Sequence, residues 1–168
     1  GRAVDRAAAN LPGWIIDRAM RTPYTHLPGY MERYWFLRIG RRGGGQSGHY
    51  PLLGARVHHI LRSDSGRDYH DHPWPFLTII LRGGYWEWQP VLDSAGFIVE
   101  EHCRWYGPGS VIFRRAGTWH RLVLPEGKTT WTLFCTGPKS QGWGFLVGNR
   151  KVPWREYLGV PAGVGVED

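Results

Sequence analysis

The sharpest chemical signal in this sequence is a pair of histidines in Tyr-His-Asp-His-Pro-Trp, residues 69–74. In a strand, residues i and i+2 face the same side, so His70 and His72 would project together. Two neighbouring imidazoles can bind one divalent metal ion. The alternative is a pair of histidines that share a surface without a metal. A second segment places His120 three residues after Gly117, at the start of an expected strand.

Four other residues could take part in the chemistry of a pocket near these histidines. Glu87 could act as a general acid or base if it points inward, or it could pair with a surface arginine. Tyr106 could donate a hydrogen bond or a proton to a ligand. Either Arg114 or Arg115 could bind a carboxylate or phosphate group, while the other faces solvent.

Two further residues are candidates for contact with a substrate. His58 and the adjacent His59 cannot both face inward, and a half-exposed strand histidine is the alternative for either of them. Arg56 shares a face with His58, and an arginine inside a barrel is costly unless it binds an anion. Trp74 could belong to an aromatic pocket or to ordinary core packing. The other tryptophans proposed for that pocket are Trp86, Trp88, Trp105 and Trp119.

Short strands separated by glycine and proline turns are expected to position these residues. The 24 glycines and 12 prolines punctuate apolar, aromatic-rich segments, which is typical of an all-β sandwich or barrel. A first strand is expected over residues 33–39. The later strands are expected over residues 55–62, 74–81, 85–89, 96–105, 110–114, 119–124 and 129–136.

The chain divides into three regions around this series of strands. Residues 1–54 form an N-terminal helix, an arm and a Gly-rich loop, residues 55–136 the barrel, and residues 137–168 an aromatic tail that packs on the barrel. The helix, expected over residues 3–20, should be interrupted by a Leu-Pro-Gly break. The three consecutive glycines within residues 41–51 predict a mobile loop.

The two histidine segments together resemble the two motifs of the cupin superfamily, which read roughly G(x)5HxH(x)3–4E(x)6G and G(x)5PxG(x)2H(x)3N. The resemblance covers about residues 55–136 and implies an all-β double-stranded β-helix, a jelly-roll barrel with a short N-terminal helical segment added. The matching residues are His70, His72 and Gly83 or Gly84 in the first motif, and Gly109, Gly117 and His120 in the second.

This sequence departs from the cupin pattern at several positions. The motif-one glutamate would fall at Phe76 or Leu77, and neither side chain can bind a metal. Arg115 and Leu124 replace the proline and asparagine of the second motif, and Asp64 replaces the opening glycine of the first.

The resemblance therefore implies one divalent metal ion on three histidines, His70, His72 and His120, with no carboxylate, as in the thiol dioxygenases. Iron is favoured, with zinc, manganese and nickel as alternatives. The stretches HDHPW, GGYWE and VPWREYL are similar to small cupin-like proteins of phage and bacterial genomes, a group that implies no settled reaction.

The cupin resemblance implies a metal-dependent enzyme, with oxygenase and isomerase chemistry among the reaction classes, acting on a small anionic substrate. One alternative is a metal-containing module that binds a small ligand or nucleotide without catalysis. Another is a nucleic-acid-associated modification protein, because a net charge of +7 favours acidic partners. A basic surface without such a partner remains a further explanation of the charge.

The cysteines and the apolar stretches also bear on the cellular compartment and on membrane helices. The two cysteines, Cys103 and Cys135, form no CxxC pair, which favours a reducing, cytoplasmic compartment. No apolar stretch is long enough for a membrane helix. Because many cupins pair through strand edges, the resemblance also raises the expectation of a homodimer.

Overall fold

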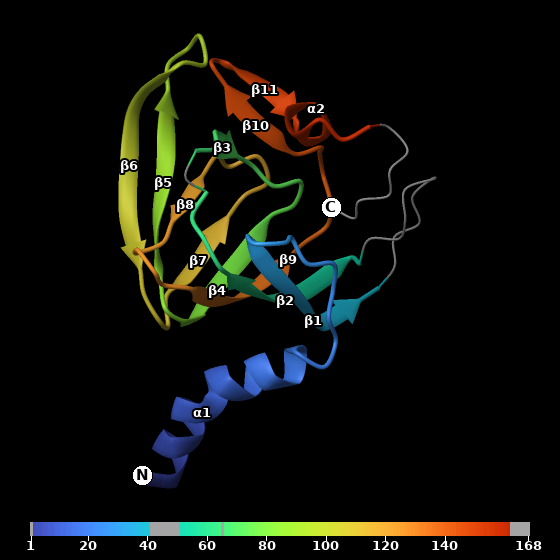
Figure 1. Ribbon diagram of the computed structural model, residues 1–168, viewed down its shortest axis with the longest axis vertical. Helices are drawn as coiled ribbons and strands as arrows, with labels where there is room; N and C mark the ends of the chain where they lie inside the picture. The colour runs from blue at the N-terminus through green and yellow to red at the C-terminus, as the bar shows by residue number, and fades with distance from the viewer. Residues whose placement is uncertain (1, 41–50, 65, 162–168) are drawn as a thin grey trace.

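A five-stranded β-sheet faces a second wall made of two three-stranded sheets, and a helix lies on the outside of the five-stranded sheet (Figure 1). The computed structural model describes residues 2–40, 51–64 and 66–161, with the backbone alone for residues 2–10. The predicted loop over residues 41–51 lies outside the described residues, apart from Pro51. The structure confirms the predicted all-β class with its N-terminal helix.

The first sheet has five antiparallel strands in the order β1-β2-β9-β4-β7. The strand over Met31–Ile39, which comes before the expected barrel in the sequence, therefore forms one edge of this sheet. Its members are β1 (Met31–Ile39), β2 (Leu53–Ile60), β9 (Thr130–Thr136), β4 (Phe76–Arg82) and β7 (Val111–Arg114).

The second wall combines two three-stranded sheets, β6-β5-β8 and β11-β10-β3. An isolated bridge between His70 and His120 joins β3 to the residue just before β8, so the two sheets continue into each other. The strands are β6 (Ile98–Tyr106), β5 (Tyr85–Leu92), β8 (Arg121–Val123), β11 (Arg150–Pro153), β10 (Gly144–Val147) and β3 (Tyr69–His70).

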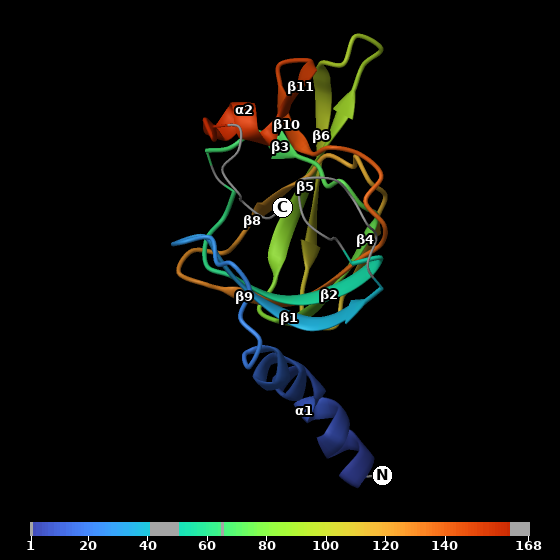
Figure 2. The same cartoon turned by 90° about the vertical axis from the view of Figure 1, so that its right-hand side faces the viewer.

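Strand β2 is buried on both faces, which explains why its sequence mixes polar and apolar residues. Val57 on the outer face belongs to one core cluster with Ile15, Ile16 and Ala19 of α1 (Arg2–Ala19). Figure 2 shows α1 below β1 and β2. Arg56 and His58 alternate with Val57 and face the space between the two walls. Apolar Ala55 and Val57 thus alternate with polar Arg56 and His58, and here the polar face of the strand is buried as well as the apolar one.

The expected break in the N-terminal helix does not occur. The helix runs without interruption from Arg2 to Ala19 with Pro12 inside it. A proline removes one helical hydrogen bond and costs about 3 kcal/mol in a helix interior. The turns that follow Pro12 pack their apolar side chains on the sheet, and tertiary packing of this kind overrides local propensity.

The interior between the walls has an aliphatic part and an aromatic part. The aliphatic cluster combines side chains of both walls, namely Ile60, Ile80, Tyr85, Ile112, Leu122 and Leu124. The aromatic cluster consists of Trp74, Phe76 and Phe134 and adjoins the functional site described below. The two clusters fill the interior between the walls on either side of that site.

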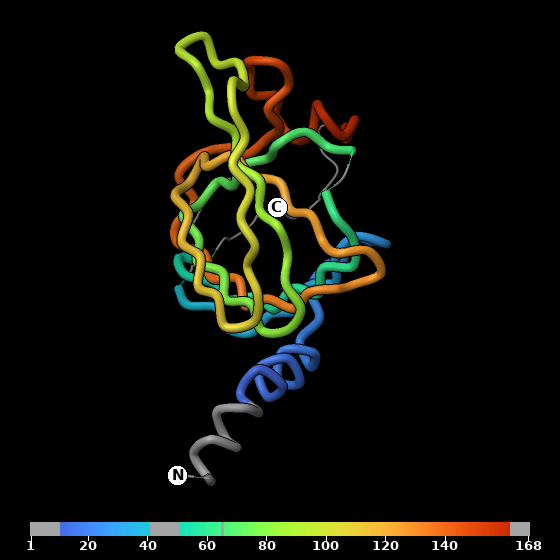
Figure 3. The backbone as a smooth tube through the Cα atoms, turned by 90° about the vertical axis from the view of Figure 1, so that its left-hand side faces the viewer, coloured from blue at the N-terminus to red at the C-terminus, as the bar shows by residue number. Residues whose placement is uncertain are grey.

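The C-terminal elements complete the second wall. In α2 (Trp154–Leu158), Trp154 stacks on Trp143 with ring centroids 5.4 Å apart, and Tyr157 stacks on Phe145 at 3.9 Å. The hairpin of β5 and β6 extends toward the β10–β11 turn (Figure 3), where the Asn149 side-chain amide donates to the carbonyl of Ala95. Neither of the helices in the described chain is long and apolar enough to cross a membrane.

The β4–β5 turn explains the predicted glycine pair. Gly83 has φ of +78°, and a Cβ at this position would lie 2.4 Å from the carbonyl oxygen of Thr129. Glycine is therefore required here for both its backbone conformation and its lack of a side chain. The turn lets β5 leave the first sheet and enter the opposite wall.

We predict that Val57→Ala lowers the free energy of unfolding by about 2 kcal/mol, because it leaves a cavity between β2 and α1. Val57 is 0% exposed. Urea unfolding followed by circular dichroism measures the change. Val99→Ala is the matched control, since Val99 lies in β6 and is 62% exposed, and we expect a change below about 0.5 kcal/mol there. Equal losses in both variants would contradict the packing of α1 on this sheet.

Candidate metal centre

Backbone pairing brings the two histidine segments together. His70 and His120 exchange two backbone hydrogen bonds, with N···O distances of 3.0 and 2.9 Å. His72 follows β3, and its carbonyl accepts a hydrogen bond of 3.1 Å from the amide of Gly117. Gly117 has φ of +77°, which explains the glycine of this turn. Main-chain hydrogen bonds thus hold the two segments in register.

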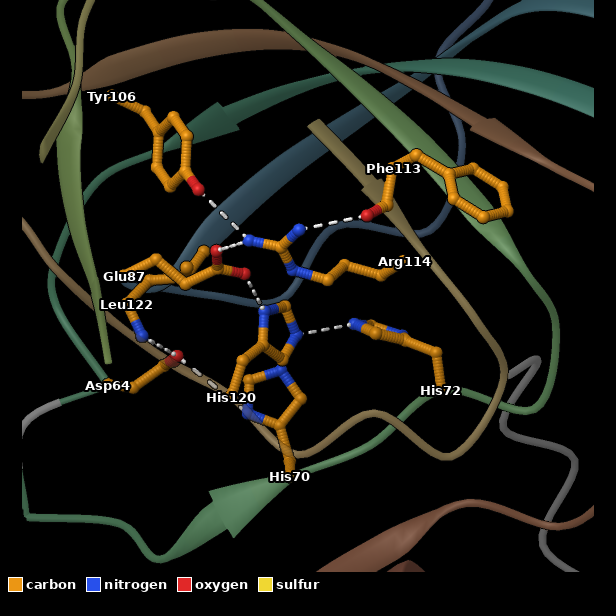
Figure 4. Close-up of polar contacts among 9 residues, drawn as sticks. All are labelled: Asp64, His70, His72, Glu87, Tyr106, Phe113, Arg114, His120 and Leu122. Carbon is orange, nitrogen blue, oxygen red and sulfur yellow. Dashed lines mark hydrogen bonds and ion pairs between the residues drawn. The ribbon is translucent and has the colours of Figure 1, made fainter. Parts of the chain in front are cut away.

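The three histidines converge between the walls (Figure 4). Each offers a ring nitrogen, and these atoms all lie within 4.8 Å of one another. The Nε2 atoms of His72 and His120 are 3.0 Å apart. The structure therefore confirms that His70, His72 and His120 form one cluster. Three imidazole nitrogens at these separations suit a single divalent metal ion with further positions open to ligands.

Two buried carboxylates lie behind the cluster. Glu87 Oε1 is 2.9 Å from His120 Nδ1, and Asp64 Oδ2 is 3.8 Å from His70 Nδ1 (Figure 4). The hydrogen bond to Glu87 favours a proton on Nδ1 of His120 and leaves its Nε2 as the ligand atom, whereas Asp64 lies at ion-pair distance from His70. The site thus contains two carboxylates beside the histidines, of which Asp64 also lines the cavity and Glu87 does not.

Both carboxylates are held by further hydrogen bonds. Asp64 accepts one from the Tyr30 hydroxyl and another, 2.9 Å long, from the amide of Leu122. Glu87 accepts one from the guanidinium of Arg114. Burial opposes ionisation of Glu87, but the hydrogen bonds from His120 and Arg114 outweigh it and hold the pKa of this carboxyl below its usual value. The negative charge is therefore retained next to the histidines.

Several residues predicted for catalysis or anion binding belong to this supporting network. Arg114 donates to Glu87 and, over 3.1 Å, to the hydroxyl of Tyr106. None of these three lines the cavity in the described structure, and Arg115 is exposed. The expectation that Arg114 or Arg115 faces the pocket is therefore not met, because Arg114 pairs with Glu87. Proton transfer by Glu87 or Tyr106 stays a prediction.

A cavity of about 420 Å³ adjoins the three histidines. His58 and Trp74, both predicted as substrate contacts, line it. The other four tryptophans proposed for an aromatic pocket do not line it in the described structure, since Trp86 and Trp105 pair with each other at the surface. Aromatic residues from β4, β9 and the C-terminal region replace them, namely Phe76, Phe134, Trp143, Phe145 and Trp154.

The protonation state of the cluster fits metal binding. Burial, with a contribution from the neighbouring His120 and against the opposing charge of Asp64, lowers the pKa of His70 to about 4, and burial and His120 lower the pKa of His72 well below its usual value. These imidazoles are therefore neutral near pH 7, which is the form that binds a metal ion. The neutral imidazoles of His70 and His72, beside His120 and with carboxylates next to two of the three rings, form a suitable environment for a divalent cation.

Asp71, between the two histidines of the first segment, is a structural residue that the sequence analysis did not identify. Its buried carboxylate accepts hydrogen bonds from the amide of Gly144 at 2.8 Å, the Gln141 side chain at 3.0 Å and the Lys151 ammonium. Alternation along the segment is the signal that could have revealed it, because Asp71 must point away from His70 and His72. It ties this segment to the β10–β11 hairpin.

Comparison with solved structures gives matches of low identity. A DMSP lyase from Ruegeria pomeroyi is 21% identical over 64% of this chain and 47% of its own, with a TM-score of 0.41. The polyketide cyclase RemF from Streptomyces resistomycificus is 18% identical over 82% of this chain and 85% of its own (TM-score 0.48). A vicilin from hazelnut, Corylus avellana, is 12% identical over 78% and 35% (TM-score 0.50).

Of these, the vicilin bears on the fold, and none of the three bears on activity or substrate. The chain spans about half the length of the lyase that it matches. No protein-family model matches the sequence, and no curated protein sequence matches it.

We predict that the metal-free protein loses stability as the pH falls below about 6.5, partly because of His58. Burial, and then the charges of Arg56 and Arg33, lower the pKa of His58 well below its usual value. The unfolded chain therefore binds a proton near pH 6.5 that the folded chain does not bind, so stability decreases toward acid.

Urea unfolding between pH 5 and 7, in the presence of a chelator, measures this dependence. We expect His58→Gln to reduce the slope by up to about 1.4 kcal/mol per pH unit, the equivalent of one proton. His102→Gln, at an exposed histidine, should leave the slope as it is. An unchanged slope in His58→Gln would show that this imidazole is not held neutral in the folded protein.

Proposed function

This chain has the cupin fold that its motifs resemble, and from that premise we propose that it is a metal-dependent enzyme acting on a small molecule. His70, His72 and His120 would hold one divalent metal ion. The observation that carries the proposal is the convergence of three imidazole nitrogens within 4.8 Å at the edge of a cavity of about 420 Å³. A cavity of this size suits a small ligand.

The residues of the chain would bind, orient and shield the reacting groups. A divalent ion on three neutral imidazoles keeps its full charge and supplies Lewis-acid activation or, if it is iron, activation of O₂. Glu87 and Asp64 would hold His120 and His70 in the orientation that presents Nε2. The rings of Phe76 and Phe134, with centroids 4.7 and 5.5 Å from that of His72, would exclude water beside this ligand.

We favour iron and an oxygenase or isomerase reaction, with zinc, manganese and nickel as alternative ions. Binding of a small ligand or nucleotide without turnover is the competing function, and the same cavity would serve it. Action on nucleic acid is supported by net charge alone, and two of the arginines, Arg33 and Arg56, are buried in the cavity wall.

The test of the metal site is the metal content of the purified protein, measured by mass spectrometry. We expect about one equivalent of metal in the wild type and a large loss in His72→Ala, because one of three ligands is removed. His102→Ala is the matched control, since His102 is exposed and lies outside the cluster. About one equivalent of iron would direct activity assays to oxygen-consuming reactions, and zinc would direct them to isomerisation.

Absence of metal from the wild type, even after reconstitution with each of the four ions, would overturn the proposal. One equivalent of metal with no turnover of any small molecule would favour the binding module over the enzyme.

We further predict that Glu87→Gln weakens metal binding by about 10- to 100-fold, because His120 loses a charged hydrogen-bond acceptor that orients its ring. Competition with a chromogenic chelator measures the affinity, and circular dichroism verifies that the variant folds. Glu126→Gln, at an exposed glutamate in the β8–β9 turn, is the control for the charge change. Equal affinity in wild type and Glu87→Gln would show that Glu87 does not position His120.

A further inference from the structure

We infer that the cavity contains an anion subsite, formed by Arg33, Arg56, His58 and Trp74, that binds the carboxylate or phosphate group of the substrate. The inference rests on the proposed function for the reaction that follows binding. The subsite itself consists of residues other than the three histidines, so its existence can be tested separately.

Two positive charges are buried in one wall of the cavity. Arg33 is 7% exposed and Arg56 is 4% exposed, and both line the cavity. They lie on neighbouring strands, where Arg33 is directly opposite His58 and Trp35 is directly opposite Arg56. Two guanidinium groups that line the same cavity make its potential positive there, so an anionic ligand would find a favourable environment.

Aromatic rings hold the two guanidinium groups in place. The Cζ atom of Arg56 is 4.5 Å from the centroid of the Trp35 ring and 5.2 Å from that of Trp74. The Cζ atom of Arg33 is 4.5 Å from the centroid of Tyr24. These distances are those of cation–π contacts, and the Nε of Arg33 also donates a hydrogen bond of 2.6 Å to the carbonyl of Thr25. Guanidinium groups held in this way are well suited to bind a carboxylate or phosphate.

Two other polar atoms in the same wall have no hydrogen-bond partner in the described structure. They are Nε1 of Trp74 and Nε2 of His58, and both residues are more than nine-tenths buried. Buried polar atoms are nearly always hydrogen-bonded, so a ligand in the cavity would account for both. The indole nitrogen can only donate, which means that the ligand must supply an acceptor.

The electrostatics of the wall agree with an acceptor of negative charge. Burial, and then Arg56 and Arg33, lower the pKa of His58, which shows that the potential at this imidazole is positive. The neutral imidazole can carry its proton on Nε2 and become a second donor beside Trp74.

The subsite lies one aromatic ring away from the metal ligands. The ring of Phe134 stacks on His58 with centroids 4.9 Å apart, and its centroid is 5.5 Å from that of His72. A molecule that reaches both places is therefore small, with an anionic group at one end and its reacting atoms near the three histidines. The predicted substrate class is a small carboxylate or phosphate compound.

Titration of the full-length protein with inorganic phosphate and with succinate tests the subsite. Isothermal titration calorimetry gives the affinity, and the indole N–H resonance of Trp74, assigned with Trp74→Phe, reports where the anion binds. We expect a saturable shift of this resonance with at least one probe, and the two probes distinguish a phosphate ligand from a carboxylate ligand.

Arg56→Gln should weaken binding of that probe by about tenfold or more, because a charge-assisted hydrogen bond is lost. Arg115→Gln is the matched control at an exposed arginine outside the cavity and should bind like the wild type. If Arg56→Gln does not fold, Arg56→Lys keeps the charge but loses the planar donors and should still weaken binding. Trp74→Phe removes one neutral donor and should weaken binding by about two- to tenfold.

The inference fails if neither probe shifts the Trp74 resonance in a saturable way, or if the folded Arg56 variant binds as tightly as the wild type. His72→Ala separates this result from the proposed function. We expect this variant to lose the metal and to keep its affinity for the anion, whereas the Arg56 variant should keep the metal and lose the anion.

Discussion

The main-chain pairing of His70 with His120 is the interaction on which the other features of this molecule depend. It places two of the three metal-ligand candidates side by side, and it also joins the two three-stranded sheets into one wall. The site and the architecture therefore share the same pair of hydrogen bonds. Asp71 reinforces this junction by tying the first histidine segment to the C-terminal hairpin.

Charge is distributed unevenly around the cavity. Asp64 and Glu87 lie behind the three histidines in the second wall, and Arg33 and Arg56 lie in the first wall. The carboxylate side favours a cation and the guanidinium side favours an anion. A metal ion would be attracted to the carboxylate side and an anionic substrate to the guanidinium side, which links the two proposals through the electrostatics of one cavity.

Sequence patterns best predicted the features that depend on residues close together in the chain. Alternating apolar residues between glycine turns predicted the strands, because side chains of a strand alternate between its faces. Pro12 and Arg114 show the limit of such reasoning. The helix continues through Pro12 because Ile15 and Ile16 pack on the sheet. Arg114 does not line the cavity, because it pairs with Glu87, a residue distant from it in the sequence.

The sequence by itself determined the all-β class and the pairing of His70 with His72, because strand alternation is a local property. The resemblance to the cupin motifs added His120 as the third residue. The tertiary structure alone decided which charges surround them. Whether Glu87 supports His120 or faces the cavity depends on the packing of β5 against β7 and β8, and the place of Arg33 beside His58 depends on the register of β1 and β2. Registers and long-range contacts of this kind are set by the packing of the whole chain, which no single segment encodes.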